Sequence, residues 1–188
     1  ATSDAIAQTA NGEILEIANQ GKNAPDLLIY NQIIAGKTAW MIRTSCNIGA
    51  VRANGTPEQV AGATDYGFNL GMAFQIVDDM LDYTGVSSDI GKNLGADLRE
   101  GKVTLPLLYA RLHTSEENRA LIDAAIRSGN GDFDKISSIV IESQAIARCK
   151  QRAEQEFERG KAALLQLSPS IFRDSLLQLL FYTVCRDR

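Results

Sequence analysis

Cysteine, proline and histidine are scarce in this sequence of 188 residues, which has 3 Cys, 4 Pro and 1 His. The cysteines, Cys46, Cys149 and Cys185, are odd in number, far apart and without a C-x-x-C pair. This pattern argues against a disulfide framework and a zinc site, and it favours a reducing compartment such as the cytoplasm. No apolar run reaches the roughly 18 residues of a membrane span. The first residues also lack the basic-then-apolar pattern of a secretory signal.

An excess of positive charge is missing as well. The chain has 19 Lys and Arg against 23 Asp and Glu, which gives a net charge of −4. Nucleic acid is therefore not an expected partner, because binding to a phosphate backbone requires a basic surface. The hydrophobic fraction of 45% and the charged fraction of 22% are close to globular averages. The length suits one domain with a real core.

Apolar residues recur at three- and four-residue spacing along the chain, so the sequence predicts an all-α fold. The clearest helix start is Thr56-Pro57-Glu58-Gln59, which combines an N-cap Thr, Pro at the first helical position and a capping-box Gln. This helix is expected to run to about Tyr83, with Gly85 as its stop. Other helices are predicted at about residues 3–19, 26–52, 104–112, 115–127, from 134, at 143–167 and at 171–184, with an irregular stretch at 85–102.

Glycines interrupt the helix that begins at Thr56, and each costs about 1 kcal/mol relative to Ala in a helix. Gly67 and Gly71 are four residues apart and therefore share one face. A neighbouring helix or a ligand could approach closely there. Close helix packing is the preferred interpretation.

The most informative run of residues is Phe-Gln-Ile-Val-Asp-Asp-Met-Leu-Asp at positions 74–82. At about 100° per residue, Gln75, Asp78, Asp79 and Asp82 share one arc of the helix. Three carboxylates near a helix C-terminus repel one another and oppose the helix dipole, so a compensating cation is expected. Oxygen-only ligands suit Mg²⁺, which takes one or two carboxylates, keeps waters and bridges to phosphates. A solvated acidic patch is the alternative, since D-D-x-x-D arises often by chance.

Lysines in glycine-containing segments could supply the positive groups of a phosphate site, beside the aspartates that could bind Mg²⁺. Lys92 and Lys102 each follow a glycine in the irregular stretch, which can fold back over the acidic face. Lys37 and Thr38 also follow a glycine, in mid-helix, and offer an ammonium and a hydroxyl together. Each lysine alone is more typical of a solvated surface. Together with the aspartates, they indicate a site for a diphosphate and Mg²⁺.

Four motifs also occur in the order and at the spacing of a known family. They are Gly36-Lys37-Thr38-Ala39, Gly71-x-x-Phe74-Gln75-x-x-Asp78-Asp79-x-x-Asp82, Gly91-Lys92-x-x-Gly95-x-Asp97 and Lys102-x-Thr104-Leu105-Pro106. This set resembles the trans-prenyltransferase (polyprenyl diphosphate synthase) family, and Gly12-Glu13 resembles that family's Gly-Glu element. The closing Arg186-Asp187-Arg188 is most similar to its bacterial long-chain branch, the octaprenyl diphosphate synthase type.

The resemblance implies a helical bundle of the isoprenoid synthase type and a chain-elongation reaction. An allylic diphosphate ionises with the help of Mg²⁺, the double bond of isopentenyl diphosphate attacks the allylic cation, and a proton is lost. Repeated condensation gives a long all-trans polyprenyl diphosphate. The resemblance also implies a homodimer.

The resemblance assigns the site residues as well. Asp78, Asp79 and Asp82 form the second aspartate-rich motif and bind Mg²⁺, with Asp78 and Asp82 as the preferred ligands. Asp78, Asp79 and Lys92 are the expected catalytic residues. The allylic diphosphate is expected to contact Lys37, Thr38, Gln75, Lys92 and Lys102. The single histidine, His113, is expected at the surface.

The resemblance covers nearly the whole chain, but only the later part of a family member. The first aspartate-rich motif, the upstream Gly-Lys-Arg region and other basic residues for isopentenyl diphosphate are missing, and the sequence opens at Ala1. Residues 1–188 are therefore expected to be the C-terminal portion of a single prenyltransferase domain, with the upstream helices missing and inactive alone. Glu16 stands where many relatives carry Gln.

Three other interpretations stay open at this point. A class I terpene cyclase shares the fold and the metal chemistry, but it normally has a different second metal motif, and the Lys92 loop argues against it. A non-catalytic subunit of a heteromeric prenyltransferase would explain the missing first motif, although a regulator has no use for three costly carboxylates. The third is a structural helical bundle whose motifs arise by chance.

Overall fold

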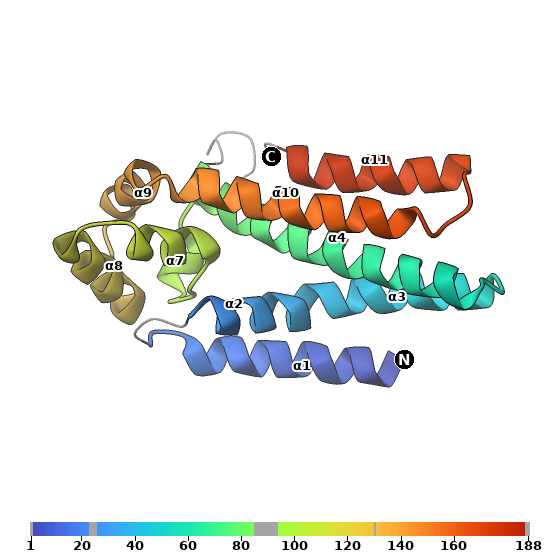
Figure 1. The fold of residues 1–188 in the computed structure, drawn as a ribbon. Helices are drawn as coiled ribbons and strands as arrows, with labels where there is room; N and C mark the ends of the chain where they lie inside the picture. The colour runs from blue at the N-terminus through green and yellow to red at the C-terminus, as the bar shows by residue number, and fades with distance from the viewer. Residues whose placement is uncertain (1, 23–25, 85–93, 130, 187–188) are drawn as a thin grey trace.

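The protein is helical throughout the residues that its computed structural model describes, which are 2–22, 26–84, 94–129 and 131–186 (Figure 1). Within these ranges there is no strand, which confirms the predicted all-α fold. No helix there has the length and apolarity needed to cross a membrane. The elements are α1 (Thr2–Asn19), α2 (Leu27–Ile34), the π-helix η1 (Ala35–Ala39), α3 (Trp40–Arg52), α4 (Pro57–Thr84), α6 (Ala96–Arg99), α7 (Leu105–Leu112), α8 (Glu116–Ser128), α9 (Phe133–Glu142), α10 (Ala145–Leu164) and α11 (Ile171–Cys185).

Local sequence signals set the start of the longest helix, α4. The Thr56 N–H donates to Gln59 Oε1 at 3.0 Å, and the Gln59 N–H donates to Thr56 Oγ1 at 3.3 Å. This is the predicted reciprocal capping box, and Pro57 is the first helical residue. The helix runs to Thr84, close to the predicted end.

The predicted helix at 26–52 is present, but in three consecutive parts. A π-helical turn at Ala35–Ala39 separates α2 from α3 and carries Lys37 and Thr38. Wider turns of this kind are frequent at functional sites. The stretch predicted as irregular also differs, because it contains the short helix α6.

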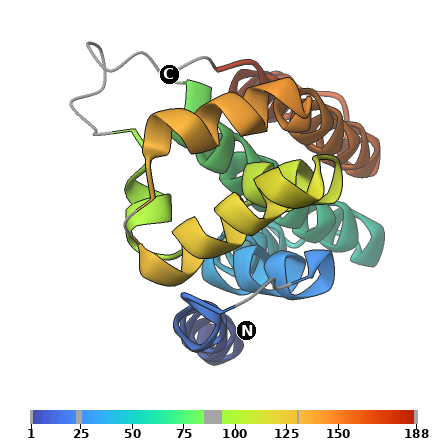
Figure 2. The same ribbon diagram turned by 90° about the vertical axis from the view of Figure 1, so that its left-hand side faces the viewer.

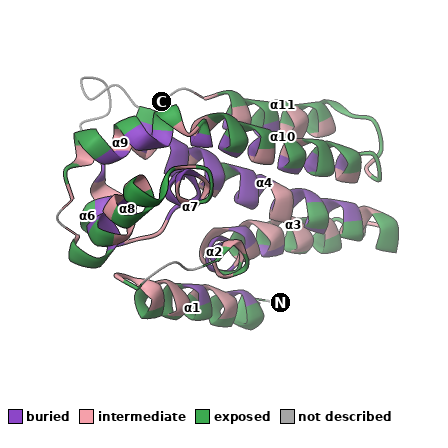
Figure 3. Cartoon of the chain, turned by 60° about the vertical axis from the view of Figure 1, so that its left-hand side comes forward, coloured by how far each residue is buried: buried purple, intermediate pink, exposed green. Residues whose placement is uncertain are grey.

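The long helices lie side by side, with α4 in the middle. α1 packs on η1, α3 and α10 pack on α4, and α11 packs on α10 (Figure 1). Helices α7, α8 and α9 gather at one end of this stack, as the end-on view in Figure 2 shows. Figure 3 shows that α4 is buried along most of its length. The aspartate-rich segment of α4 lies toward the end that α7 to α9 cover.

Glycines bring the backbones of four neighbouring elements, α1, η1, α3 and α4, into close contact. A Cβ on Gly12 of α1 would lie 2.6 Å from Lys37 N, and one on Gly36 would lie 2.8 Å from Gly12 Cα. A Cβ on Gly71 of α4 would lie 2.5 Å from Ala39 Cα. One on Gly67 of α4 would lie 2.8 Å from the carbonyl oxygen of Ile42 in α3. No side chain fits at these points. The preferred interpretation of Gly67 and Gly71, close helix packing, is confirmed.

Large apolar side chains remain exposed at the two outer layers. On α1, Ile6 is 60% exposed and Ile14 and Ile17 are each 64% exposed. On α11, Phe172 is 75% and Tyr182 is 67% exposed. No described part of the chain covers these faces.

Candidate active site

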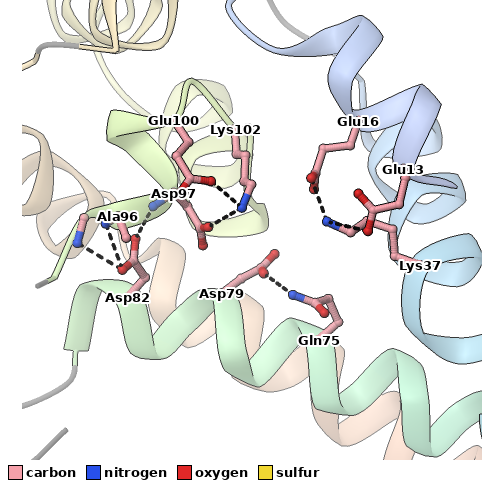
Figure 4. A network of polar contacts seen from close by, with 11 residues as sticks. Glu13, Glu16, Lys37, Gln75, Asp79, Asp82, Ala96, Asp97, Glu100 and Lys102 are labelled. Atoms are coloured by element: carbon pink, nitrogen blue, oxygen red, sulfur yellow. Dashed lines mark hydrogen bonds and ion pairs between the residues drawn. The ribbon is translucent and has the colours of Figure 1, made fainter. Parts of the chain in front are cut away.

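A cavity of about 250 Å³ lies where α1, α2, η1 and α4 meet the segment before α7. Five predicted site residues from three separate motifs line it together, which are Lys37, Gln75, Asp78, Asp79 and Lys102. Its other polar lining residues are Glu16, Asn19, Gln20, Tyr30, Asp97 and Thr104. Figure 4 shows Lys37 and Lys102 on opposite sides, with Gln75 and Asp79 between them on α4. The fold therefore brings most of the predicted site residues to one place.

Asp79 is the most buried charged group of the site, with 4% of its surface exposed. Its Oδ2 accepts a hydrogen bond from Tyr30 Oη at 2.8 Å, and its Oδ1 accepts one from Gln75 Nε2 at 2.9 Å. Gln75 Oε1 in turn accepts from Thr38 Oγ1 at 3.0 Å. Burial raises the pKa of Asp79 to about 7, although the two hydrogen bonds favour its charged form. These contacts hold the Gln75 amide and the Asp79 carboxyl in fixed orientations.

Asp82 makes a different set of contacts from its two neighbours in the motif. Its Oδ1 accepts from the backbone N–H groups of Gly95 at 3.0 Å and Ala96 at 3.2 Å, and its Oδ2 accepts from Asp97 N at 3.3 Å. The carboxylate thus caps the N-terminus of α6 and fixes the segment that leads to Lys102 (Figure 4). Burial raises the pKa of Asp82, while these backbone hydrogen bonds oppose that shift. Its role as a Mg²⁺ ligand stays a prediction.

Asp78 has a cationic neighbour that the motifs did not point to. Its Oδ1 lies 3.7 Å from Nη2 of Arg186, which follows α11. The Arg186 guanidinium lies 4.2 Å from the centre of the Phe74 ring, and its Nη2 donates to the Phe74 carbonyl oxygen at 3.1 Å. Arg186 therefore supplies part of the positive charge expected beside the aspartates. The two residues after it lie outside the described ranges.

The carboxylates present fit Mg²⁺ in their chemistry but do not form a cage. Asp78, Asp79 and Asp97 line the same cavity, and oxygen ligands are those that Mg²⁺ prefers. Among the described residues, however, no group of three or more His, Cys, Asp or Glu side chains is close enough to hold a metal ion. The donors fit an ion that takes one or two carboxylates and completes its coordination with water or phosphate oxygens.

Lys37 is held by carboxylates of α1. Its Nζ lies 2.6 Å from Glu16 Oε2 and 3.6 Å from Glu13 Oε1 (Figure 4). The Glu16 side chain is 16% exposed and the Glu13 side chain is 50% exposed. The shorter, more buried contact with Glu16 is the stronger one.

Lys102 is held in the same manner on the other side of the cavity. Its Nζ lies 2.7 Å from Glu100 Oε2 and 3.3 Å from Asp97 Oδ1. Burial lowers the pKa of Lys102, but the hydrogen bonds and charges of these carboxylates outweigh it, so the net shift is upward. Both lysines therefore already have anionic partners.

Two further residues named in the sequence analysis are Lys92 and His113. Lys92 lies outside the described residues, so its assignment as a diphosphate contact stays a prediction. His113 is exposed at the C-terminal end of α7, as expected. Tyr30, Arg186 and Glu16 are the site residues that the motifs did not identify as such. Their partners are distant in sequence, so no local pattern predicts these contacts.

Comparisons with known proteins agree with this geometry. The polyprenyl synthetase family matches residues 1–142. The chain is 38% identical to the octaprenyl diphosphate synthase of Escherichia coli (strain K12), over 99% of this chain and 58% of that protein. It is 39% identical to the all-trans-nonaprenyl-diphosphate synthase (geranyl-diphosphate specific) of Rhodobacter capsulatus, over 92% of this chain and 53% of that protein. The chain thus spans little more than half the length of these relatives.

Solved structures of the same kind share the fold. A decaprenyl diphosphate synthase from Rhodobacter capsulatus superposes with a TM-score of 0.91 at 34% identity, over 99% of this chain and 58% of that chain. A polyprenyl synthase from Caulobacter crescentus CB15, complexed with calcium and isoprenyl diphosphate, gives a TM-score of 0.93 at 33% identity, over 100% and 58%. With motifs, fold and cavity in agreement, the chain belongs to the polyprenyl synthetase family of trans-prenyltransferases.

Proposed function

We propose that this chain is the C-terminal portion of the catalytic domain of a Mg²⁺-dependent polyprenyl diphosphate synthase. The enzyme condenses an allylic diphosphate with isopentenyl diphosphate to give a long all-trans polyprenyl diphosphate. The observation that carries the proposal is a single cavity that is lined by Asp78 and Asp79 of α4 together with Lys37 and Lys102. Carboxylates for a divalent cation and ammonium groups for phosphate oxygens are the two halves of a diphosphate site.

The lysines would act on the leaving group. Lys37 and Lys102 exchange their carboxylate partners for phosphate oxygens of the allylic substrate. Positive charge at these positions stabilises the negative charge that develops as the C–O bond breaks. Mg²⁺, when held by Asp78 and Asp79, supplies further neutralisation of the diphosphate.

The Thr38–Gln75–Asp79–Tyr30 chain of hydrogen bonds has a positioning role. It links η1, α4 and α2, so that Gln75 and Asp79 face the cavity in one orientation. Groups held in place before the substrate arrives need no reorganisation during the reaction. The described residues contain no histidine in the cavity, and the leaving diphosphate itself can accept the final proton.

The parent protein is proposed to supply what this sequence lacks. The chain contains no second D-D-x-x-D, so the first aspartate-rich motif and the isopentenyl diphosphate pocket would come from outside these 188 residues. We place the enzyme in the cytoplasm as a homodimer. The free cysteines support the compartment, and the exposed apolar face of α1 supports an interface. No observation favours a terpene cyclase or a non-catalytic subunit.

The test is a product analysis with the full-length gene product. It is incubated with labelled isopentenyl diphosphate, an allylic primer and Mg²⁺, and the dephosphorylated products are separated by chromatography. We expect a series of linear polyprenols that ends in a long-chain product, and no product when EDTA removes the metal. A cyclic hydrocarbon, or no product at all with Mg²⁺, would contradict the proposal.

A further inference from the structure

Carboxyl groups outnumber ammonium groups in the lining of the cavity. Its charged lining residues are the carboxylates Glu16, Asp78, Asp79 and Asp97 and the ammonium groups Lys37 and Lys102. A metal-free diphosphate is a multiply charged anion, and the carboxylates would repel it. A divalent cation on the diphosphate removes much of that repulsion.

Glu16 is the carboxylate that acts most directly on a diphosphate-binding group. Its Oε2 lies 2.6 Å from Lys37 Nζ, at charge-assisted hydrogen-bonding distance. The two side chains are only 16% and 22% exposed, so water screens the pair less than it screens a surface pair. A phosphate oxygen that binds this lysine therefore competes with Glu16 for the same ammonium group.

The backbone keeps Glu16 in this place. Gly12 lies one helical turn before Glu16 on α1, and it touches the backbone at Gly36 and Lys37 without an intervening side chain. This backbone contact sets the distance between α1, which carries Glu16, and η1, which carries Lys37. Glu13, at 3.6 Å from Nζ and half exposed, is a looser partner on the same helix.

We propose that Glu16 is a specificity-determining residue that increases the dependence of diphosphate binding on a divalent cation. In the metal-free cavity its carboxylate engages Lys37 and adds to the field that repels a free diphosphate. When a cation accompanies the diphosphate, the ligand carries less net charge and Lys37 exchanges Glu16 for a phosphate oxygen. This inference rests on the proposed function and adds a residue that selects the metal-bound form of the ligand.

The experiment measures the binding of inorganic pyrophosphate by calorimetry, with EDTA and then with excess Mg²⁺. The full-length gene product is compared with Glu16→Gln, which keeps the shape of the side chain and removes its charge. We expect the affinity of Glu16→Gln to rise about three- to tenfold in EDTA and to change less than about twofold with Mg²⁺. The gain in EDTA should shrink as ionic strength rises, because it is electrostatic. A purely structural role would not respond to salt in this way.

Two further variants serve as controls for Glu16→Gln. Glu13→Gln removes the same charge from the same helix at the looser partner, and its gain in EDTA should be less than half as large. Lys37→Gln should lose affinity under both conditions. Glu16→Ala provides a second test should Glu16→Gln fold poorly, and circular dichroism checks the helicity of each variant.

The possible results of this experiment separate a failure of the role of Glu16 from a failure of the proposed function. Weaker pyrophosphate binding by Glu16→Gln in EDTA, or an equal change under both conditions, would overturn the role of Glu16 and leave the proposed function intact. A wild-type protein that binds no pyrophosphate even with Mg²⁺ would overturn both proposals.

Discussion

Single residues of the site differ in what they contact, and Asp78 is far more accessible than its neighbour Asp79. Its side chain is 41% exposed, whereas Asp79 is buried and hydrogen-bonded and Asp82 caps α6. A carboxylate that faces the cavity and is not committed to a hydrogen bond with the backbone is the one most available to a metal ion. The contribution of Asp78 should therefore appear in catalysis more than in stability.

We expect Asp78→Ala in the full-length gene product to lower kcat/KM by about 10²–10³-fold, which is about 3–4 kcal/mol, by analogy with the loss of one preorganised electrostatic contact. Steady-state kinetics of product formation measures the effect. Lys150→Ala, on the exposed side of α10, is the control and should change the rate by less than about twofold. Lys92→Ala tests the predicted contact outside the described ranges in the same assay. Equal rates for Asp78→Ala and Lys150→Ala would show that the site lies elsewhere.

A second prediction for a single residue concerns the hydroxyl of Tyr30. Tyr30→Phe removes the 2.8 Å hydrogen bond to Asp79 and leaves a buried carboxyl oxygen with one donor fewer. We expect the free energy of unfolding to fall by about 1–3 kcal/mol. Urea unfolding followed by circular dichroism measures it in metal-free buffer. Tyr182→Phe, at an exposed position of α11, should cost less than about 0.5 kcal/mol. Equal costs at the two positions would contradict the assignment.

Among the elements, α6 depends on Asp82 for its start. We expect Asp82→Ala to leave the N–H groups of Gly95, Ala96 and Asp97 without their acceptor and to destabilise this segment by about 1–2 kcal/mol. Hydrogen exchange in EDTA should show faster exchange of these amides. Asp65→Ala, an exposed carboxylate on the same helix, is the control. If exchange speeds up only in the presence of Mg²⁺, Asp82 acts as a metal ligand and not as a cap.

The elements also show what could be predicted from the sequence. Gln75, Asp78 and Asp79 sit on one helix, so the helical period alone places them together, and the capping box at Thr56 sets where that helix begins. These signals are local.

Features that depend on distant partners could not be predicted in this way. Tyr30 and Asp79 are 49 positions apart, and Arg186 and Phe74 are 112 positions apart. The π-helix at Ala35–Ala39 lies where α1 touches the backbone through Gly12, a contact between separate elements. The ion pair between Lys37 and Glu16 follows from the same contact. Residue types and spacing predicted the chemistry of the site, and tertiary packing decided which partners its charges have.

On the scale of the whole molecule, the exposed apolar faces predict how the chain behaves in isolation. Ile14 and Ile17 on α1 and Phe172 on α11 have no described partner, and large exposed apolar patches drive association. We expect the 188-residue chain expressed alone to form oligomers or aggregates in size-exclusion chromatography and to lack synthase activity. Replacing Ile14 and Ile17 by Gln should raise the monomer fraction, whereas Leu165→Gln, 73% exposed at the end of α10, should not. A monodisperse, monomeric and active chain would contradict this expectation.

The glycine contacts have a consequence for attempts to redesign the cavity. Because α1 meets η1 and η1 meets α4 through main-chain atoms, at Gly12, Gly36 and Gly71, the distance across these three elements is fixed by atomic radii and not by any choice of side chain. A methyl group at Gly71 would push η1, which carries Lys37, away from α4, which carries Asp79, and one at Gly12 or Gly36 would push η1 away from α1. A mutant library aimed at new ligands should therefore keep these three positions constant, and vary the residues at either end of the cavity.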